Sequence, residues 1–253
     1  MITDTHSHLF WQDFDGDRDA VIARAREAGV ERMIVVGTDL ETSRRCFELA
    51  EGAPGLYATA GIHPHDAADV PGEVLAEVRA LCEREDCVAV GETGLDHFKE
   101  YSPKVEQRRL FRWHLELARE LDKPVIVHCR DAHADTVALL REVPGVRGVM
   151  HCYSMGPEEL PPYLELGFHI SFSGVVTYPK NQFNRDAAAA VPEDRLLVET
   201  DCPFLAPQSK RGKRNEPALV VETLRRVAEV RGADPEALAE RTSANAAALF
   251  GLS

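Results

Sequence analysis

Short apolar runs alternate along the chain with longer segments in which apolar residues recur at helical spacing. The runs are continuous, as in Met33-Ile34-Val35-Val36 and Val125-Ile126-Val127. Continuous apolar runs are typical of strands that are buried on both faces of a parallel sheet. Eight strands are predicted on this basis, over Ile2–Thr5, Arg32–Gly37, Leu56–Ile62, Val88–Gly91, Pro124–His128, Arg147–His151, Phe168–Ser173 and Arg195–Glu199.

Amphipathic helices are predicted between the strands. The clearest apolar stripes are Val74, Leu75, Val78, Leu81 and Cys82 after Pro71, then Phe111, His114, Leu115, Ala118 and Leu121, and finally Leu219, Val220, Thr223, Leu224 and Val227. The pattern is weakest around the seventh strand, where Gly174–Pro179 resembles a loop and the helix near Asp186–Val191 is short. Eight strand–helix units predict an α/β fold, a (β/α)8 TIM barrel that forms a single domain over residues 1–253. The tail from Asp234 to Ser253 is expected to add one or two capping helices.

Composition narrows the class of protein. The chain has 253 residues, of which 44% are hydrophobic and 28% charged, as in a globular protein with a full core. Its net charge of −13 disfavours a protein that coats nucleic acid or an anionic membrane by bulk charge. No apolar run reaches the ~18 residues that a membrane span needs. The first residues lack the basic and apolar regions of a secretory signal, so a cytoplasmic location without a membrane partner is expected. The six cysteines contain no C-x-x-C pair and are expected to be reduced thiols.

Histidines and carboxylates stand where the predicted strands end, which is where a barrel places its active site. His6 and His8 are two residues apart on an extended segment, so their side chains project to the same side and can bind one cation. Imidazole nitrogen together with carboxylate oxygen suits zinc or another divalent ion. The sequence predicts six metal ligands at these strand ends: His6, His8, Glu92, His128, His151 and Asp201.

The number of ligands indicates two ions rather than one. His128 and His151 exceed what the shell of the first ion can accept, Glu92 would bridge the two ions, and Asp201 would complete the first shell. Two divalent ions can hold a hydroxide nucleophile and clamp the attacking and leaving oxygens. Asp201 would accept the proton of the attacking water, so Glu92 and Asp201 are the predicted catalytic residues. Zinc, magnesium and manganese all remain open as the native metal.

Other histidines and cysteines have structural interpretations. A lone histidine at the end of a strand, or an isolated H-x-H, is more often structural than a metal ligand, and only the ordered set favours the metal site. His114 lies on an apolar helical stripe and is predicted to be a core residue, while His133 and His169 are also taken as structural. The thiols that directly follow predicted ligands should point away from them, towards the outer helices; these are Cys129, Cys152 and Cys202.

Seven segments in order carry a family resemblance: Asp4-Thr5-His6-Ser7-His8, Gly61-Ile62-His63-Pro64-His65, Gly91-Glu92-Thr93-Gly94-Leu95-Asp96, Pro124-Val125-Ile126-Val127-His128, His151-Cys152-Tyr153-Ser154, Glu199-Thr200-Asp201-Cys202-Pro203 and Arg214-Asn215-Glu216-Pro217. They resemble the TatD family of metal-dependent hydrolases, which are barrels of the amidohydrolase superfamily. The resemblance implies one ion on His6, His8, Glu92 and Asp201, and a second on Glu92, His128 and His151. It also implies a deoxyribonuclease, often a 3′-exonuclease that acts on single-stranded or damaged DNA.

A phosphodiester substrate needs cationic or hydrogen-bonding partners. His63, Arg130 and Arg214 are the predicted substrate-binding residues, and Lys210, Arg211 and Lys213 form a basic loop beside Arg214. Base stacking or a hydrophobic rim contact is possible at Trp11, Phe98 and Tyr178. Asp96 is expected to orient a neighbouring side chain.

The sequence leaves three hypotheses about the function. The first is hydrolysis of DNA from its 3′ end by two divalent ions. The second is a metal-dependent ester or amide hydrolase that acts on aminoacyl-tRNA or a small metabolite, because the same ligands can activate attack on carbonyl carbon. The third is a metal-binding protein without activity, which an intact Asp201 disfavours. A DNA end is the expected partner, and the protein is expected to be a monomer or weak oligomer.

Overall fold

The computed structural model describes residues 1–252 and arranges eight strands in one sheet, in the order β1 to β8. The strands are β1 (Ile2–Ser7), β2 (Val30–Val35), β3 (Leu56–Ala60), β4 (Cys87–Asp96), β5 (Val125–Arg130), β6 (Gly148–Met150), β7 (His169–Phe172) and β8 (Leu196–Val198). All eight predicted strands are therefore confirmed, with ends that shift by a few residues. The largest difference is β4, which continues to Asp96, whereas the sequence pattern predicted an end at Gly91.

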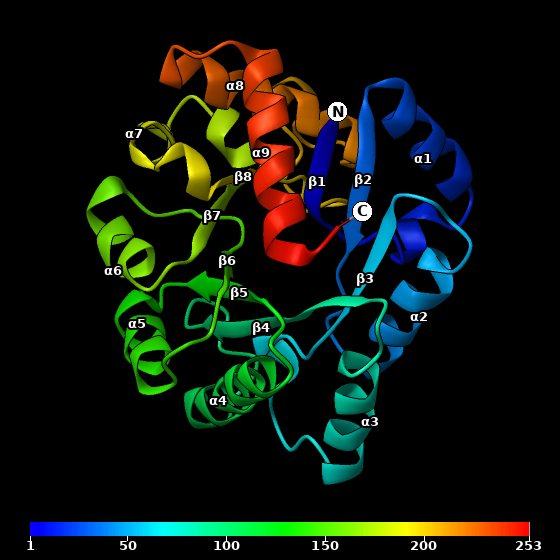
Figure 1. Ribbon diagram of the computed structural model, residues 1–253, viewed down its shortest axis with the longest axis vertical. Helices are drawn as coiled ribbons and strands as arrows, with labels where there is room; N and C mark the ends of the chain where they lie inside the picture. The colour runs from blue at the N-terminus through cyan, green and yellow to red at the C-terminus, as the bar shows by residue number, and fades with distance from the viewer. Residues whose placement is uncertain (253) are drawn as a thin grey trace. The chain divides into compact units, whose positions relative to one another are not determined.

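Helices follow the strands, as Figure 1 shows along the colour gradient. They are α1 (Arg18–Glu27), α2 (Leu40–Ala50), α3 (Gly72–Cys82), α4 (Lys104–Glu120), α5 (His133–Glu142), α6 (Leu160–Glu165), α7 (Gln182–Ala190), α8 (Val220–Arg231) and α9 (Pro235–Phe250). The three predicted apolar stripes lie on α3, α4 and α8. The weak seventh region contains a 3₁₀ turn at Gly174–Thr177 and a helix that begins at Gln182, earlier than predicted. The tail forms one helix, which Asp234 caps by accepting hydrogen bonds from two backbone amides.

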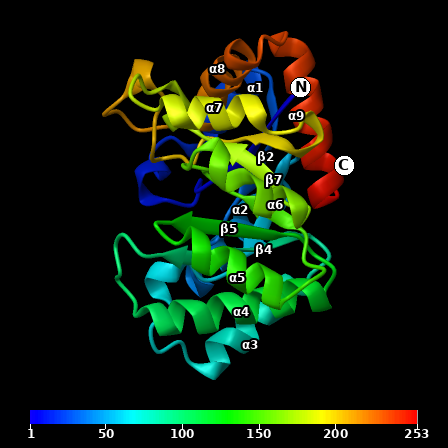
Figure 2. The ribbon, with the colours of Figure 1, turned by 90° about the vertical axis from the view of Figure 1, so that its left-hand side faces the viewer.

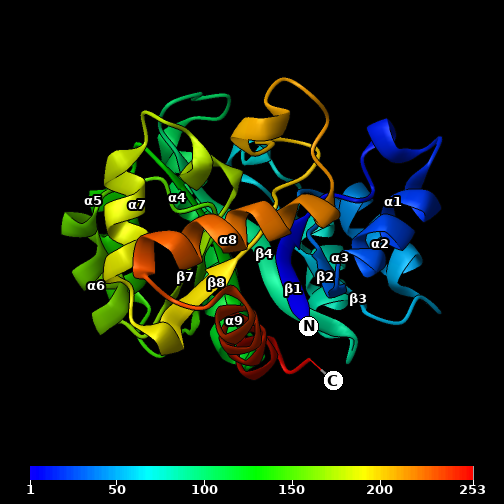
Figure 3. The same ribbon diagram turned by 90° about the horizontal axis from the view of Figure 1, so that it is seen from above.

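The chain forms two compact units. Unit 1 contains residues 1–35, 152–161 and 169–252. Its strands β1 and β2 are paired in parallel, as are β7 and β8, and a parallel bridge joins Ser7 to Cys202. Helix α9 packs on β1 and β8, and it lies beside β1 in Figure 3. The carboxyl ends of β1 and β8 are thereby brought together.

Unit 2 contains residues 36–151 and 162–168. Its four strands, β3 to β6, are paired in parallel. Helix α4 packs on β4 and α5 contacts β5, as Figure 2 shows. The parallel pairing brings the carboxyl ends of β4, β5 and β6 to one edge of the sheet.

The apolar runs form the core, as their pattern predicted. Met33, Ile34 and Val35 in unit 1 and Val125–Val127 in unit 2 are fully buried. All six cysteines are free thiols, in agreement with the sequence expectation. Within residues 1–252, no helix has both the length and the apolar character that crossing a membrane requires.

Candidate metal centre

Unit 1 holds three of the predicted ligands at the carboxyl ends of β1 and β8, and we call them the first donor set. The Nε2 atoms of His6 and His8 lie 3.2 Å apart. Asp201 Oδ1 lies 3.4 Å from His8 Nε2 and 3.7 Å from His6 Nε2. All three side chains are buried or nearly so. Two imidazole nitrogens and one carboxylate oxygen therefore converge on one point.

Backbone hydrogen bonds hold Asp201 against β1. The Asp201 amide donates to the carbonyl of His6 at 2.9 Å, and the His8 amide donates to the carbonyl of Cys202 at 2.8 Å. Asp201 itself has a φ of +60°, a left-handed conformation that aspartate tolerates better than most residues. The turn after β8 thus directs the carboxylate back towards the two histidines of β1.

The buried carboxylate of Asp4 ties the same two strand ends together. It accepts hydrogen bonds from the amide and hydroxyl of Thr200, at 2.9 and 2.6 Å, and from the His6 amide at 3.3 Å. Burial raises the pKa of Asp4 to about 8, with a further contribution from the charge of Glu199 and against the effect of these hydrogen bonds. Asp4 is therefore a residue that positions His6 and Asp201.

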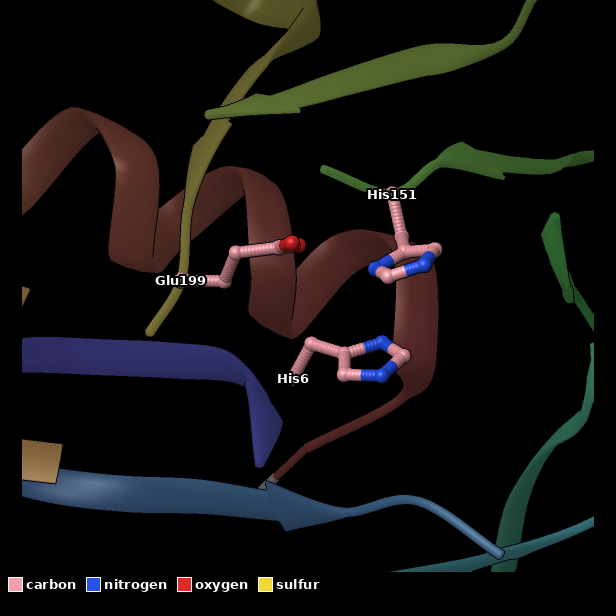
Figure 4. A group of neighbouring side chains, drawn as sticks. All are labelled: His6, His151 and Glu199. Carbon is pink, nitrogen blue, oxygen red and sulfur yellow. The ribbon is translucent and has the colours of Figure 1, made fainter. Parts of the chain in front are cut away.

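Glu199 is a second carboxylate that the sequence interpretation did not assign to the site. It follows β8, is fully buried, and accepts a hydrogen bond from the Cys152 amide at 2.7 Å. Figure 4 shows Glu199 and His6 with their side chains directed into the same space, and their ligand atoms lie within 4.8 Å of each other. The sequence did offer one indication of this position, because Glu199 stands two residues before Asp201. It did not show which residues the buried side chain of Glu199 faces.

Unit 2 holds the other three predicted ligands, which we call the second donor set. Glu92 Oε1 lies 3.1 Å from His128 Nδ1 and 3.0 Å from His151 Nε2. The two imidazole nitrogens lie 3.4 Å from each other. The carboxylate comes from β4, His128 from β5, and His151 directly follows β6. The three members of each donor set thus belong to one unit.

His63, predicted to bind substrate, lies beside the second donor set. Its Nε2 is 3.4 Å from Glu92 Oε1, and its Nδ1 accepts a hydrogen bond from the His65 amide. Burial lowers the pKa of His63 to about 4, and the charge of Glu92 only partly opposes this. His63 is therefore neutral at neutral pH, with its proton on Nε2 and directed towards the carboxylate.

Two glycines allow β4 to present Glu92. Gly94 has a φ of +136°, and a Cβ atom there would lie 2.0 Å from the His128 carbonyl oxygen. Gly91 has a φ of +137° and the same close approach to β5, with 2.7 Å to the Ile126 carbonyl oxygen. Side chains at these positions would separate β4 from β5 and so move Glu92 away from His128.

Asp96 orients the histidines of unit 2, as the sequence predicted for this residue. Its fully buried Oδ2 accepts hydrogen bonds from His65 Nε2 at 2.8 Å and from His128 Nε2 at 3.2 Å. Burial alone would raise the pKa of Asp96, but bonds from His128, the Lys99 amide and His65 outweigh it and lower the pKa. Because the proton of His128 is on Nε2, its Nδ1 lone pair is available towards Glu92.

Replacing Asp96 with asparagine is therefore expected to weaken metal binding by about 10- to 100-fold, the usual cost of losing a partner that orients a ligand. The asparagine keeps the shape of the side chain but accepts hydrogen bonds more weakly than a carboxylate. Competition with a chromophoric chelator measures the affinity. A variant with the affinity of the unmodified protein would show that Asp96 does not govern the orientation of His128.

Both donor sets fit a divalent cation. Ligand atoms at the corners of a tetrahedron around zinc are ~3.3 Å apart when each bond is ~2.05 Å long. The spacings within the first set run from 3.2 to 3.7 Å, and those within the second from 3.0 to 3.4 Å. In the second set the His128 lone pair faces a carboxylate, which is favourable only when a cation or a proton lies between them. Consistent with this, hydrogen bonds to Asp96 and Glu92 outweigh burial and raise the pKa of His128.

The histidines interpreted as structural lie outside both sets. His114 is fully buried in α4, accepts a hydrogen bond from the Ile62 amide at 3.1 Å, and has a pKa lowered by burial to about 4. His133 at the start of α5 lies 3.0 Å from the Tyr163 hydroxyl through Nδ1. His169 is buried on β7.

None of the three thiols that follow ligands belongs to a candidate metal-binding group in the described part of the chain. Cys129 Sγ accepts a hydrogen bond from Thr136 of α5 at 3.3 Å, so it points to the outer helix as predicted. Cys202 is fully buried. Cys152 has a φ of +44°, beyond the end of β6, and its Sγ lies 3.1 Å from the Ser173 hydroxyl.

Arg214, a predicted substrate contact, is held by an aspartate of unit 1. Both of its Nη atoms donate to the Asp17 carboxylate, at 2.8 and 2.7 Å, and its guanidinium lies 4.8 Å from the centre of the Phe14 ring. Hydrogen bonding to Arg214 lowers the pKa of Asp17 to about 2. Two residues further on, Glu216 pairs with Arg24 at 2.6 Å. The Arg214–Glu216 segment is thus fixed to the first helix of the chain.

Asn215, which lies between Arg214 and Glu216 in the chain, stabilises the loop that carries Asp201. Its buried amide group donates to the carbonyls of Thr200 at 2.9 Å and Phe204 at 2.6 Å. These bonds close the loop on both sides of Asp201. The sequence interpretation assigned no role to Asn215, because its partners are backbone carbonyls, 15 and 11 positions earlier, and the sequence does not show how the loop between them folds.

Replacing Asn215 with alanine is expected to lower the free energy of unfolding by about 1–3 kcal/mol, since buried carbonyls lose their donor. Urea denaturation followed by circular dichroism measures the change. A loss smaller than about 0.5 kcal/mol, the range of ordinary surface substitutions, would mean that water replaces the amide without cost and that the loop does not depend on Asn215.

The remaining residues suggested for substrate contact lie on loops, except Arg130, which is the last residue of β5. Lys210, Arg211 and Lys213 are exposed, and the Arg211 guanidinium lies 4.8 Å from the centre of the Tyr178 ring. Trp11 packs against Phe204 with ring centres 5.4 Å apart. Arg130 and Phe98 are in contact in unit 2, with the guanidinium 4.0 Å from the ring centre.

Comparison with known proteins identifies the family. The family described as TatD related DNase matches residues 3–251. The chain is 41% identical over 252 residues to the "Uncharacterized metal-dependent hydrolase YabD" of Bacillus subtilis, covering 99% of each chain. It is 42% identical over 246 residues to the "3'-5' ssDNA/RNA exonuclease TatD" of Cronobacter sakazakii, covering 94% of this chain and 93% of the relative.

Solved structures agree with this result. A TatD homologue from Escherichia coli, YjjV, has a TM-score of 0.94 at 32% identity and covers 100% of this chain and 98% of its own. A TatD family hydrolase from Entamoeba histolytica has a TM-score of 0.88 at 22% identity, covering 100% and 98%. The structural similarity confirms the predicted (β/α)8 barrel. Membership of the family shows that the protein is a hydrolase that acts on ester bonds. The chain belongs to the TatD family of metal-dependent hydrolases.

Proposed function

We propose that this hydrolase removes nucleotides from the 3′ end of single-stranded DNA, and that it uses two divalent ions to do so. The observation that carries the proposal is the pair of donor sets, each combining imidazole nitrogen and carboxylate oxygen at ligand spacing within its own unit. Relatives named as 3′-5′ ssDNA/RNA exonucleases, such as the one from Cronobacter sakazakii, supply the direction of cleavage and the class of substrate. Bound divalent ions would supply Lewis-acid activation of water and charge stabilisation at the phosphate.

Each donor set has a distinct role in the proposal. His6, His8 and Asp201 would hold one ion, and Glu92, His128 and His151 would hold the other. The family resemblance is the basis for giving Glu92 a bridging role. Asp201 also takes the proton of the attacking water, because its carboxylate completes a set whose other two members are neutral imidazoles when they bind a metal.

The substrate contacts are proposed at His63, Arg130 and Arg214. Neutral His63 can donate its Nε2 proton to a phosphate oxygen. Among residues 1–252, Arg130 has no carboxylate within 4.0 Å, so its charge is available to phosphate. Arg214 is paired with Asp17, and this ion pair fixes the orientation of the Arg214 guanidinium before a substrate binds.

End-labelled oligonucleotides test the proposal. With Mg²⁺, Mn²⁺ or Zn²⁺ present, a 3′ label on single-stranded DNA should be released early as a mononucleotide, and a 5′ label should give a descending ladder. Chelation by EDTA should stop both reactions. Release that starts from the 5′ end, internal cuts only, or no cleavage with any of the metals would contradict the proposal. Hydrolysis of an aminoacyl ester but not of DNA would favour the carbonyl substrate that the same ligands could serve.

A further inference from the structure

Two aromatic side chains are exposed on the loop that follows β4. Phe98 is 56% exposed and Tyr101 is 65% exposed, among the largest values for apolar side chains in residues 1–252. Two cations accompany them: Lys99 from the same loop and Arg130 from the end of β5. We call these four residues the loop platform. Exposed aromatic rings interleaved with cations are the arrangement that proteins use to bind single-stranded nucleic acid.

The cations of the loop platform contact rings rather than carboxylates. The Arg130 guanidinium carbon lies 4.0 Å from the centre of the Phe98 ring. The Lys99 ammonium lies 5.8 Å from that ring centre and 5.7 Å from the centre of Tyr101. In the described part of the chain, no carboxylate lies within 4.0 Å of the charged group of either cation. In a chain with a net charge of −13, two uncompensated cations on one loop platform mark a local site for an anion.

Two nearby carboxylates have cations of their own, whereas Asp131, which follows Arg130 in the chain, forms no ion pair within 4.0 Å among the described residues. Glu100 pairs with Lys104 at 2.8 Å, and Asp135 of α5 pairs with Arg108 at 2.7 Å. An arginine stacked on an aromatic ring keeps its N–H edge free to bind a phosphate. The Arg130–Phe98 pair is thus prepared for a phosphate.

The loop platform lies next to the second donor set. The ring centre of Tyr101 is 4.8 Å from that of His65, and His65 Nε2 donates to Asp96 Oδ2 at 2.8 Å. The same carboxylate oxygen accepts a hydrogen bond from His128 at 3.2 Å. One imidazole and one carboxylate therefore separate Tyr101 from a predicted metal ligand, which is a short distance for a nucleotide next to the cleaved bond.

We propose that the loop platform binds single-stranded DNA beside the cleavage site, with Tyr101 stacked on a base and Arg130 bonded to a backbone phosphate. The inference rests on the proposed nuclease function, and it adds the surface that selects the substrate. Stacking uses the face of the base, which every base has, so binding is tolerant of sequence. In a duplex the faces of the bases are already stacked, so the loop platform favours a single strand.

Fluorescence anisotropy of a labelled single-stranded oligodeoxynucleotide, with EDTA present to prevent hydrolysis, tests the stacking. Tyr101→Ala should raise the Kd about tenfold, within the range found for removal of a base-stacking aromatic. Tyr101→Phe keeps the ring and should restore binding. The matched control is Phe183→Ala, which removes an exposed phenylalanine from α7, and its Kd should stay within twofold of the unmodified protein. Equal binding by Tyr101→Ala and the unmodified protein overturns the stacking role.

Salt dependence separates the role of Arg130 from that of Tyr101. Loss of one phosphate contact should reduce the slope of log K against log salt by ~0.7 for a single strand. Arg130→Ala should show this reduction and Tyr101→Ala should not. Arg141→Ala, an exposed arginine in the last turn of α5, serves as the matched control and should keep the full slope. An unchanged slope in Arg130→Ala overturns the phosphate contact.

The outcomes distinguish the loop platform from the nuclease function. If the unmodified protein cleaves single-stranded DNA but Tyr101→Ala and Arg130→Ala leave Kd and KM unchanged, the loop platform is wrong and the nuclease function stands. If the protein binds single strands through these residues but cleaves no DNA with any metal, the nuclease function is wrong and the binding surface stands. A blunt duplex should bind more weakly than a single strand to the unmodified protein, and this preference should be lost in the double variant.

Discussion

Replacing Asp201 with asparagine is expected to reduce the rate of DNA hydrolysis about 10³-fold, near the middle of the range for removing a general base. Asp201 Oδ1 lies 3.4 Å from His8 Nε2 and 3.7 Å from His6 Nε2, and the carboxylate is the only anion among the three predicted ligands of the first donor set. Asparagine has nearly the same size but carries no charge and is a poor proton acceptor. Single-turnover kinetics with saturating metal measure the chemical step.

A matched control lies at the other end of the same strand. Asp194 precedes β8, is exposed, and lies 3.6 Å from the guanidinium of Arg195. Asp194→Asn should therefore keep the rate of the unmodified protein. The role given to Asp201 would be wrong if Asp201→Asn, folded and loaded with metal, hydrolysed DNA within tenfold of the unmodified protein.

Replacing His128 with alanine is expected to remove one of the two ions and most of the activity. His128 Nδ1 lies 3.1 Å from Glu92 and 3.4 Å from His151, so its loss leaves the second donor set with two members. Because the first donor set belongs to the other unit, its ion should remain. Elemental analysis of the purified protein should fall from two equivalents to one.

His133 provides the matched control for this substitution. It belongs to the same unit and lies 3.0 Å from the Tyr163 hydroxyl, outside the donor sets. His133→Ala should retain both equivalents of metal. Two equivalents in His128→Ala would mean that the second ion is held by other residues, of which His63, 3.4 Å from Glu92, is the first to examine.

The sequence predicts the strands well because the physical cause of the pattern is local. A strand buried on both faces needs a continuous apolar run, and each of the eight runs forms a strand. The predicted position of the end of β4 was wrong, and this error also has a physical reason. Gly91 and Gly94 resemble turn residues in the sequence, but in the sheet they allow β4 to approach β5 closely and to continue to Asp96.

The sequence allowed candidate ligands to be chosen, because they stand at the ends of predicted strands. It did not allow the residues that position these ligands to be identified. Asp4 acts through hydrogen bonds to Thr200, 196 positions away, and Asn215 acts through bonds to backbone carbonyls 15 and 11 positions away. Likewise, nothing in the local sequence says that Arg214 pairs with Asp17 across 197 positions. Such pairings depend on the tertiary packing of distant segments, and the periodicity of apolar residues does not reveal that packing.

The net charge also needs tertiary structure to be interpreted. A total of −13 disfavours nucleic acid as a partner when charge is treated as uniform. In the structure, carboxylates such as Glu216 and Glu100 are paired with cations, and others form the donor sets. Arg130 and Lys99 remain available beside the second set. The local charge, rather than the total, is therefore the quantity that bears on the proposed nucleic-acid substrate.

Anomalous diffraction from crystals grown with Mn²⁺ tests the central claim most directly. We predict two anomalous peaks, one in contact with His6, His8 and Asp201, and the other with Glu92, His128 and His151. A shared contact of both peaks with Glu92 would establish its bridging role. A single peak, or peaks at other side chains, would contradict the assignment of two metal sites on which the proposed hydrolysis depends.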